Sequence, residues 1–350
     1  MQNLDKSEVS TLLEKIGLHA QFKENSAALW VDGLKKISHV PVHYLSHFVD
    51  YQSIVFKSKS DSLINISMII LNDNKPCGYW PLFYDPRSCE FVKSLNDQYG
   101  GIVLPPLFID NLPKKTERRV INSCLTFLRH LKVACTGTVW RASELTASTT
   151  VSQWYQLCLE NGATLDKVCY ELYVDLSLPL DKIRSSIRKS YRPLVSSGLK
   201  NWNVSVMDSH CEDTWEKFRS LHRHVSGRVT RPIQSWELQH EAIKNGDAFL
   251  IHVNDSDGKM VGAGYFDMSA KEGNYSVATY DKNLSDQPLG HLVQYQAILT
   301  LKEKQKDLYY LGSRFFIADP PHVSEKQIDI SSFKAGFSTF MAPRTVLLMS

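Results

Sequence analysis

This sequence lacks long hydrophobic runs, and its opening segment has little of the character of a secretory signal. No apolar run approaches the roughly 18 residues that a membrane-spanning helix needs. The opening segment 1–8 carries acidic residues and has no apolar core, which is unlike a secretory signal. We therefore expect a cytoplasmic protein without a membrane span.

Paired cysteines and the common catalytic motifs are lacking as well. The seven cysteines are an odd number, are widely scattered and form no C-x-x-C pair. This pattern indicates reduced, mostly buried thiols rather than a disulfide framework. There is no H-E-x-x-H motif, and we expect no metal site. A G-x-S-x-G elbow is also missing, so a covalent serine intermediate has no support.

Length and composition favour a globular protein of two domains. The chain has 350 residues, of which 43% are hydrophobic and 22% charged, and its formal net charge is +3. These fractions are typical of folded proteins, and the length suffices for two domains of common size. The small net charge argues against a protein that coats nucleic acid, but it is compatible with one local basic groove.

The segment from Ala248 to Ser350 shows the clearest succession of secondary structure. Three short β-rich runs separated by turn-forming clusters predict an antiparallel meander with strands at 248–253, 260–267 and 275–280. After the third strand, the spacing of the apolar residues changes to that of a helix, which predicts a helix around 292–301. The segments that follow predict a strand at 308–311, a helical segment containing 330–337 and a strand near 345–349. Before the meander, we predict a strand at 203–207 and helices at 213–225 and 235–245.

The first half shows a fainter version of the same order. The same rules predict strands at 64–71, 78–84, 90–95, 138–140 and 171–175, and helices at about 116–131 and 152–160. There is no letter-by-letter repeat, so the repetition is one of architecture. We therefore predict two similar α/β units, residues 1–177 and 178–350.

A basic run without acids lies at the start of the second unit. Residues 182–200 contain six cationic side chains: Lys182, Arg184, Arg188, Lys189, Arg192 and Lys200. The three arginines recur every four residues, so a helix places them on one face until Pro193 and Gly198 interrupt it. A solvated helix face is one interpretation. An anion site is the other, because unpaired like charges repel and a phosphate relieves that repulsion.

Three motifs carry a resemblance to a known family. They are Ile-Arg-Lys-Ser-Tyr-Arg at 187–192, the segment 221–232, and the segment 324–337, in which Phe-Lys is followed by Gly-Phe. Together with the element order, they resemble the FemAB-like branch of the GNAT acyltransferases, which includes peptidyltransferases that add amino acids to cell-wall precursors. The resemblance implies an α/β protein with a mixed sheet and two tandem GNAT-like units. Family members transfer acyl or aminoacyl groups to amines, from acyl-CoA or aminoacyl-tRNA.

The resemblance leaves the donor open. GNAT enzymes hold the CoA pyrophosphate on a Q/R-x-x-G-x-G/A loop at a helix N-terminus, where free backbone N–H groups favour anions. In this sequence Gln287 and Gly290 match that loop, but Leu292 replaces its last small residue. Gln287, Gly290 and Thr279 are therefore the candidates for binding acyl-CoA, and an aminoacyl-tRNA donor is the alternative.

Candidate catalytic groups follow from the needs of acyl transfer. The carbonyl must be polarised and the leaving group protonated. By analogy, an oxyanion donor lies near Thr279 and Tyr280, and Tyr280 is a candidate proton donor, with a plain core role as the alternative. The segment 222–231 carries more cations than helix capping needs, so we predict His222 (or His224) as a base or hydrogen-bonding group.

Several cations are candidates for substrate binding. Arg228 and Arg231 are predicted to clamp a carboxylate or phosphate, alongside Arg188 and Arg192 of the basic run. Arg314 follows a strand end, where sites form in open α/β sheets. Lys334 lies among Phe and Ile; snorkelling explains it, but the resemblance implies a contact with an acceptor phosphate.

Our leading hypothesis is an N-acyltransferase that acts on an amine of a phosphate-bearing precursor. Such an acceptor is a small molecule, for example an amino sugar or nucleotide-sugar of surface-glycan or other cell-envelope polysaccharide biosynthesis. The first alternative is a Fem-type aminoacyl transferase that uses charged tRNA. The second is a non-catalytic binding protein on the same fold.

Overall fold

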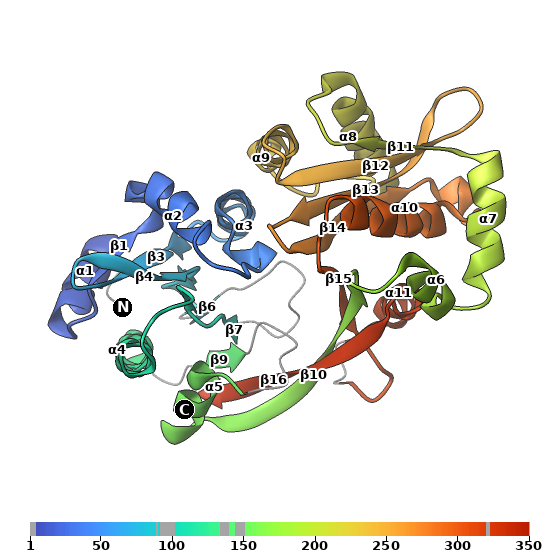
Figure 1. The fold of residues 1–350 in the computed structure, drawn as a ribbon. Coiled ribbons are helices and arrows are strands. Elements are labelled where there is room, and N and C mark those ends of the chain that lie inside the picture. Colours follow the sequence, from blue (N-terminus) through green and yellow to red (C-terminus); the bar gives the residue numbers. More distant parts are fainter. Residues whose placement is uncertain are drawn as a thin grey trace. The chain divides into compact units, whose positions relative to one another are not determined.

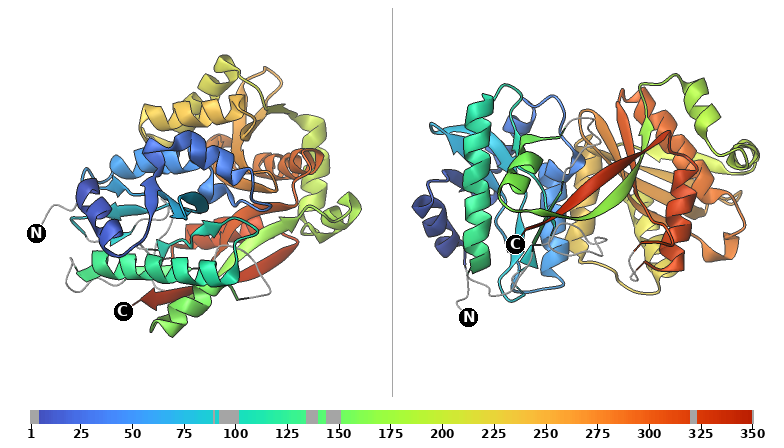
Figure 2. Two further views of the ribbon diagram at one scale, coloured as in Figure 1. Left: turned by 60° about the vertical axis from the view of Figure 1, so that its left-hand side comes forward. Right: turned by 90° about the horizontal axis from the view of Figure 1, so that it is seen from below.

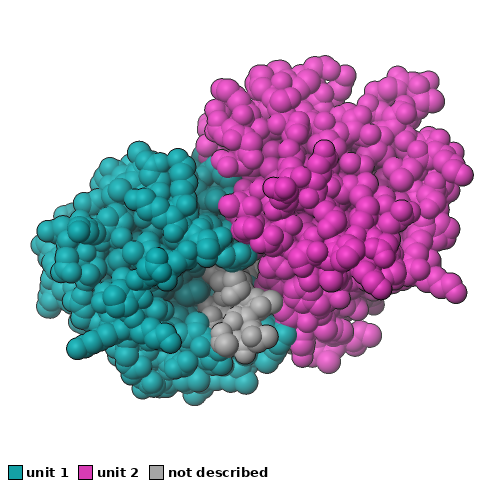
Figure 3. Space-filling view, in the orientation of Figure 1, with its two compact units in different colours: residues 1–169, 343–350 teal, residues 170–342 magenta. Residues whose placement is uncertain are grey.

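The computed structural model describes residues 5–88, 90–91, 102–133, 140–143, 151–319 and 323–349. They form two compact units, unit 1 (residues 1–169 and 343–350) and unit 2 (residues 170–342), which Figure 3 distinguishes by colour. Strands β10 (Thr164–Asp175) and β16 (Phe340–Met349) each contribute residues to both units. The division into GNAT-like units at 177 and 178 stays a prediction.

Unit 1 combines small sheets with helices (Figure 1). One antiparallel sheet has the order β1 (Ala20–Phe22), β3 (Met68–Asn72), β4 (Lys75–Trp80), β8 (Leu107–Phe108), and another the order β2 (Ile64–Asn65), β5 (Phe83–Asp85), β6 (Glu90–Phe91). Strand β7 (Ile102–Val103) pairs parallel with β9 (Trp140–Ser143), which pairs antiparallel with β16. The helices are α1 (Lys6–Lys15), α2 (Ala27–Leu34), α3 (Ser46–Lys57), α4 (Lys114–Val133) and α5 (Gln153–Glu160).

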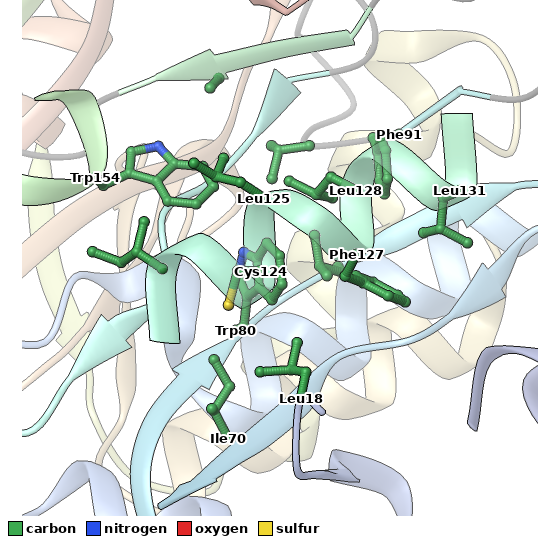
Figure 4. Close-up of a cluster of buried hydrophobic side chains, with 14 of the residues drawn as sticks. Leu18, Ile70, Trp80, Phe91, Cys124, Leu125, Phe127, Leu128, Leu131 and Trp154 are labelled. Atoms are coloured by element: carbon green, nitrogen blue, oxygen red, sulfur yellow. The ribbon is translucent and has the colours of Figure 1, made fainter. Parts of the chain in front are cut away.

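Helix α4 organises the main core of unit 1. Figure 2 shows it as a long helix along one side of the unit, and Figure 4 shows the side chains that it buries. Its apolar residues recur at helical spacing, so Cys124, Leu128 and Leu131 lie on one buried face. Phe127 of this helix and Trp154 of α5 both pack against Trp80 of β4, with ring centroids 6.2 and 6.1 Å away.

Unit 2 is a mixed sheet with helices on both faces. Its strand order is β11 (Asn203–Met207), β12 (Ala248–Asn254), β13 (Met260–Met268), β14 (Glu272–Tyr280), β15 (Leu308–Arg314), β10. Its helices are α6 (Leu180–Ser186), α7 (Tyr191–Asn201), α8 (Glu212–Ser226), α9 (Ile233–Lys244), α10 (Leu289–Glu303) and α11 (Glu325–Ala335). Figure 1 shows α8 and α9 on one side of β12 and β13 and α10 on the other.

Alternation along the strands gives each face of this sheet its own core. Leu250 and Tyr265 face α8 and α9, where they pack with Trp215. The neighbouring Ile251 and Phe266 face α10. Because successive strand residues point to opposite faces, two cores form on the two sides of one sheet.

The predicted strands and helices of the second half are confirmed, and so are the helices predicted around 116–131 and 152–160. The predicted segments 92–95 and 138–139 lie outside the described residues. Three predictions are wrong. The segments 64–71 and 78–84 each form two strands of different sheets, β2 and β3 in the first and β4 and β5 in the second, rather than one strand. The basic run does not form a single helix that ends at Pro193. Helix α6 ends at Ser186, and α7 begins at Tyr191 and continues through Pro193. Proline fits there because the first turn of a helix has no partner for its N–H groups.

The second predicted breaker, Gly198, lies within α7. A Cβ at Gly198 would stand 2.7 Å from a methyl carbon of Leu292 on α10, so glycine allows α7 and α10 to approach closely. Within the described segments, no helix combines the length and the apolar character needed to cross a membrane.

Candidate active site

Strands β14 and β15 pair over three residues and then diverge. Their parallel ladder joins residues 272–274 to residues 308–310. Strand β14 continues to Tyr280 and β15 to Arg314, and these two fully described strands form no further pair with each other. The sheet is therefore open between them from Tyr275 onward.

An irregularity marks each strand where the two diverge. In β14 the register shifts at Ser276, whose hydroxyl donates to the buried Asp267 carboxylate and accepts from the Asn274 amide, with an Nδ2–Oγ distance of 2.7 Å. In β15 the register shifts at Leu311, and Gly312 follows with a φ of +113°. Glycine adopts this backbone conformation without the strain that other residues meet.

The ammonium of Lys334, carried by α11, lies between the diverging strands. Its Nζ is 4.9 Å from the ring centroid of Tyr275 on β14 and 2.9 Å from the position of a Cβ added to Gly312 on β15. The side chain as a whole keeps partial exposure, but desolvation of its charged end lowers the pKa of Lys334 to about 8. Among the described residues, this ammonium donates no hydrogen bond and forms no ion pair. Its N–H groups are therefore available to a ligand.

Arg188 holds the last turn of α11 and thereby positions Lys334. Its backbone N–H donates to the carbonyl of Gly336 at 2.8 Å, and its guanidinium donates to the carbonyl of Ser332 at 3.0 Å. The guanidinium also donates to the hydroxyl of Tyr191 at 2.7 Å. A cation at a helix C-terminus is favourable because the helix dipole is negative there.

Aromatic rings pack against the same end of α11. A Cβ at Gly336 would stand 2.1 Å from a ring carbon of Tyr191, so this ring lies directly against the backbone. The His291 ring lies 4.5 Å from the Tyr191 ring and 5.0 Å from the Phe333 ring. Burial, and then the nearby Arg188 charge, lower the pKa of His291 to about 4, so this imidazole is neutral at pH 7.

Tyr280 belongs to a group of tyrosines, one of which, Tyr275, contacts Lys334. Its hydroxyl lies 3.2 Å from that of Tyr275, and the Tyr309 hydroxyl donates to Oε1 of Gln294 at 2.6 Å. Burial raises the pKa of Tyr280 well above its ordinary value, and the neighbouring Tyr275 raises it further. Tyr280 is therefore a protonated phenol at neutral pH, and its raised pKa makes it a weaker acid than an ordinary tyrosine.

The N-terminus of α10, where the sequence predicted a pyrophosphate loop, is covered by side chains. A Cβ at Gly290 would stand 3.2 Å from the ring of Phe333 and 3.5 Å from the ring of Tyr280. Leu292 is fully buried and packs on α7. Gln287 donates its side-chain amide to Asp286 at 3.0 Å. The side of Gly290 that a Cβ would occupy therefore faces the protein's own aromatic rings.

The predicted residues of the α8–α9 segment form a separate group. Arg231 is 8% exposed, lies 3.6 Å from the ring centroid of Trp236 and donates to Gln239 at 2.7 Å. His222 contacts the edge of the same Trp236 ring, at 5.0 Å, and burial followed by the Arg231 charge lowers its pKa. Arg228 is exposed, and its guanidinium forms no hydrogen bond or ion pair within the described residues.

The two predicted catalytic residues lie on opposite faces of the unit 2 sheet. His222 contacts Trp236, which belongs to the core under α8 and α9, while Tyr280 packs in the core under α10. Thr279 alternates with Tyr280 and so faces the α8–α9 side, where its buried hydroxyl has no hydrogen-bond partner among the described residues. Tyr280 and Lys334 thus both contact Tyr275, whereas His222 and Thr279 lie on the other face of the sheet.

Arg192 and Arg314 make local contacts. Arg192 donates to the carbonyls of Ile187 and Ser185, after the end of α6 and at its last turn. Arg314 donates to the carbonyl of Ile328 at 3.2 Å and to the hydroxyl of Ser331 at 2.8 Å, which ties β15 to α11. Both arginines stabilise the elements that carry the site.

Sequence reasoning missed Tyr275, Gly312 and His291. Tyr275 opens the predicted third strand of the meander, so its side chain looked like core. Gly312 had a signal, because a glycine directly after a short strand often marks a backbone irregularity. His291 had none, since its surroundings come from α7 and α11, which are distant in the sequence.

The element order, the diverging strands and the covering helices of unit 2 define a GNAT-type acyltransferase fold, and the chain has the fold of the FemAB-like branch. The crystal structure of FemX superposes with a TM-score of 0.63 and 12% identity, covering 94% of this chain and 97% of that one. The C-terminal domain of a putative lysylphosphatidylglycerol synthetase from Agrobacterium fabrum gives 0.58, with 12% identity and 93% coverage of both chains. L-PGS from Bacillus licheniformis gives 0.55, with 12% identity and coverage of 98% and 91%.

No protein-family model matches the sequence. No curated protein matches it either.

Proposed function

We propose that this chain is an aminoacyl transferase that moves an aminoacyl group from charged tRNA to an amine. The observation that carries the proposal is the desolvated Lys334 ammonium, which lies between β14 and β15 and has no hydrogen-bond or ion-pair partner among the described residues. A positive charge held in a low-dielectric site stabilises an oxyanion far more than the same charge in water does.

The reaction is a direct attack on the donor ester. The acceptor amine forms a C–N bond with the ester carbonyl, the carbonyl oxygen becomes an oxyanion beside Lys334, and the C–O bond to the tRNA ribose then breaks. The leaving ribose oxygen takes a proton from the Tyr280 phenol, whose raised pKa keeps that proton in place at neutral pH. The proton released by the attacking amine restores the phenol, so the reaction is balanced.

The choice of an aminoacyl ester over acyl-CoA rests on the start of α10. Phe333 and Tyr280 pack against Gly290, and the buried Leu292 stands where the loop of GNAT enzymes has a small residue, so this segment departs from a pyrophosphate loop. An aminoacyl ester needs no such loop. The structural relatives also favour an aminoacyl donor, since a lysylphosphatidylglycerol synthetase is, by its name, an enzyme that produces an aminoacylated lipid.

For the acceptor, we propose an amine on a phosphate-bearing precursor, such as an amino sugar of cell-envelope synthesis. Arg228 and Lys189 support this proposal, because both are exposed and neither has a described carboxylate partner. Each is available to a phosphate.

The test is a comparison of donors with the purified chain. Radiolabelled aminoacyl-tRNA and acetyl-CoA are each incubated with a panel of amine-bearing nucleotide-sugars, and labelled product or released thiol is measured. We expect label transfer from tRNA that Lys334→Ala abolishes. Thiol release with no transfer from tRNA would establish the acyl-CoA hypothesis instead. No turnover with either donor, together with tight binding of an acceptor, would identify a binding protein.

A further inference from the structure

Three potential metal ligands meet on the α8–α9 side of unit 2. His210 precedes α8, Glu212 is the first residue of α8, and His240 lies in α9. One ligand atom from each residue lies within 4.8 Å of those from the other two. Within the described ranges, no other group of three His, Cys, Asp or Glu side chains meets this criterion.

His240 is held rigidly in place. Its ring stacks on Trp215, with centroids 5.0 Å apart and an interplanar angle of 9°, and the His210 ring stacks at 4.5 Å and 18°. His240 is 7% exposed, and its Nε2 is buried without a hydrogen-bond partner among the described residues. Its Nδ1 lies 3.5 Å from Oε2 of Glu212, beyond the usual length of a hydrogen bond. The described surroundings therefore leave the hydrogen-bonding capacity of this buried ring unsatisfied.

We propose that His210, Glu212 and His240 bind one divalent transition-metal ion, Zn²⁺ by preference, with a fourth position open to water. Two imidazoles and a carboxylate suit zinc and related ions better than magnesium or calcium, which prefer oxygen ligands. Tetrahedral zinc with bonds of about 2.0–2.1 Å places its ligand atoms roughly 3.3 Å apart. His210 and Glu212 are exposed, and His210 turns out of its stack on His240 to bind, because a metal ion lies in the plane of each imidazole that holds it.

The proposed ion joins the first turn of α8 to α9. These two helices share the core built on Trp215, Trp236 and Leu250. Since the ion binds the folded arrangement of three residues from two helices, its binding stabilises unit 2 by mass action. The site faces away from Lys334, on the other side of the sheet, so its role is separate from acyl transfer. Sequence reasoning missed this group, because His240 lies about thirty residues after His210 and Glu212 and meets them only through the packing of α8 on α9.

The experiment is a Co²⁺ titration of chelator-treated, full-length protein, followed by Zn²⁺ competition. We expect the visible absorption of tetrahedral Co²⁺, its loss on adding Zn²⁺, and a Zn²⁺-dependent rise in melting temperature. His210→Ala and Glu212→Gln, both at exposed positions, should each weaken Co²⁺ binding at least about tenfold. His224→Ala, an exposed histidine on the same helix, is the matched control and should bind normally.

Two outcomes would overturn the proposal. One is the absence of a Co²⁺ spectrum at millimolar metal, which would leave the stacked rings as a packing feature only. The other is equal weakening by His224→Ala, or unchanged binding in His210→Ala and Glu212→Gln, which would place the metal elsewhere.

Discussion

Lys334 of α11 and Gly312 of β15 are in direct contact. The Nζ atom of the lysine lies 2.9 Å from the position that a Cβ on the glycine would occupy. The glycine has a φ of +113° and stands at the irregularity of β15. One residue thus supplies the cation and the other supplies the space for it.

Replacing Lys334 tests the cation directly. We expect Lys334→Ala to lower transfer by roughly 10²–10³-fold, the usual effect of removing one oxyanion-stabilising donor. The measurement is the single-turnover rate of label transfer at saturating acceptor. Lys326→Ala, at an exposed position of the same helix, should retain the parental rate. Equal rates for Lys334→Ala and the parent would remove Lys334 from the mechanism.

Gly312→Ala should destabilise the fold and displace the lysine. A non-glycine residue at this φ costs of order 1–3 kcal/mol, and the added methyl meets the ammonium. Denaturant unfolding measures the first effect, and transfer activity measures the second. Gly258→Ala is a matched control, because Gly258 also has a positive φ, +78°, but nothing lies within 4 Å of its Cβ. Gly258→Ala should therefore lower the free energy of unfolding and leave the transfer activity unchanged.

The lowered pKa of Lys334, about 8, predicts a pH dependence with a defined sign. The folded pKa lies below the ordinary value of about 10.4, so the unfolded chain binds more protons between these values. The free energy of unfolding of the parent relative to Lys334→Met should therefore rise with pH from about 8 to about 10.4. Activity should fall as the pH rises through about 8, because the folded lysine loses its charge there. A flat stability difference between the two proteins would contradict the lowered pKa.

The two arginines of the α8–α9 segment should behave differently. Arg231 is buried on Trp236, so Arg231→Ala should lower the free energy of unfolding by about 2 kcal/mol. Arg228 is exposed, so Arg228→Ala should change it by less than about 0.5 kcal/mol. Thermal or urea unfolding of the two variants measures this difference in the free energy of unfolding. If Arg228→Ala also weakens acceptor binding at unchanged stability, that result supports the proposed phosphate contact.

Regular elements could be predicted from the sequence where one period dominates. The strands at 260–267 and 308–311 and the helix at 292–301 follow from alternation and helical spacing. The break between α6 and α7 could not be predicted, because Pro193 acts as a helix breaker or a helix starter according to the backbone before it.

The candidate site was predictable only in part, for a related reason. Lys334 and Tyr280 were identified through the family resemblance, but the contact between Lys334, Tyr275 and Gly312 depends on how far two strands diverge. That distance is set by packing between segments far apart in the chain. His222 and Tyr280 lie on opposite faces of the unit 2 sheet. The reason is that α8, which carries His222, packs on one face, whereas the side chain of Tyr280 points to the other.

The pairing of β9 with β16 has a consequence for how the chain acquires its structure. Leu347 and Met349 of β16 lie in the core of unit 1, yet they are synthesised only after all of unit 2. During translation, unit 1 therefore waits with an incomplete core and an unpaired strand edge, which is a site for wrong association. A fragment made of residues 1–177 retains that defect permanently. Supplying residues 340–349 as a separate peptide is a direct way to repair it.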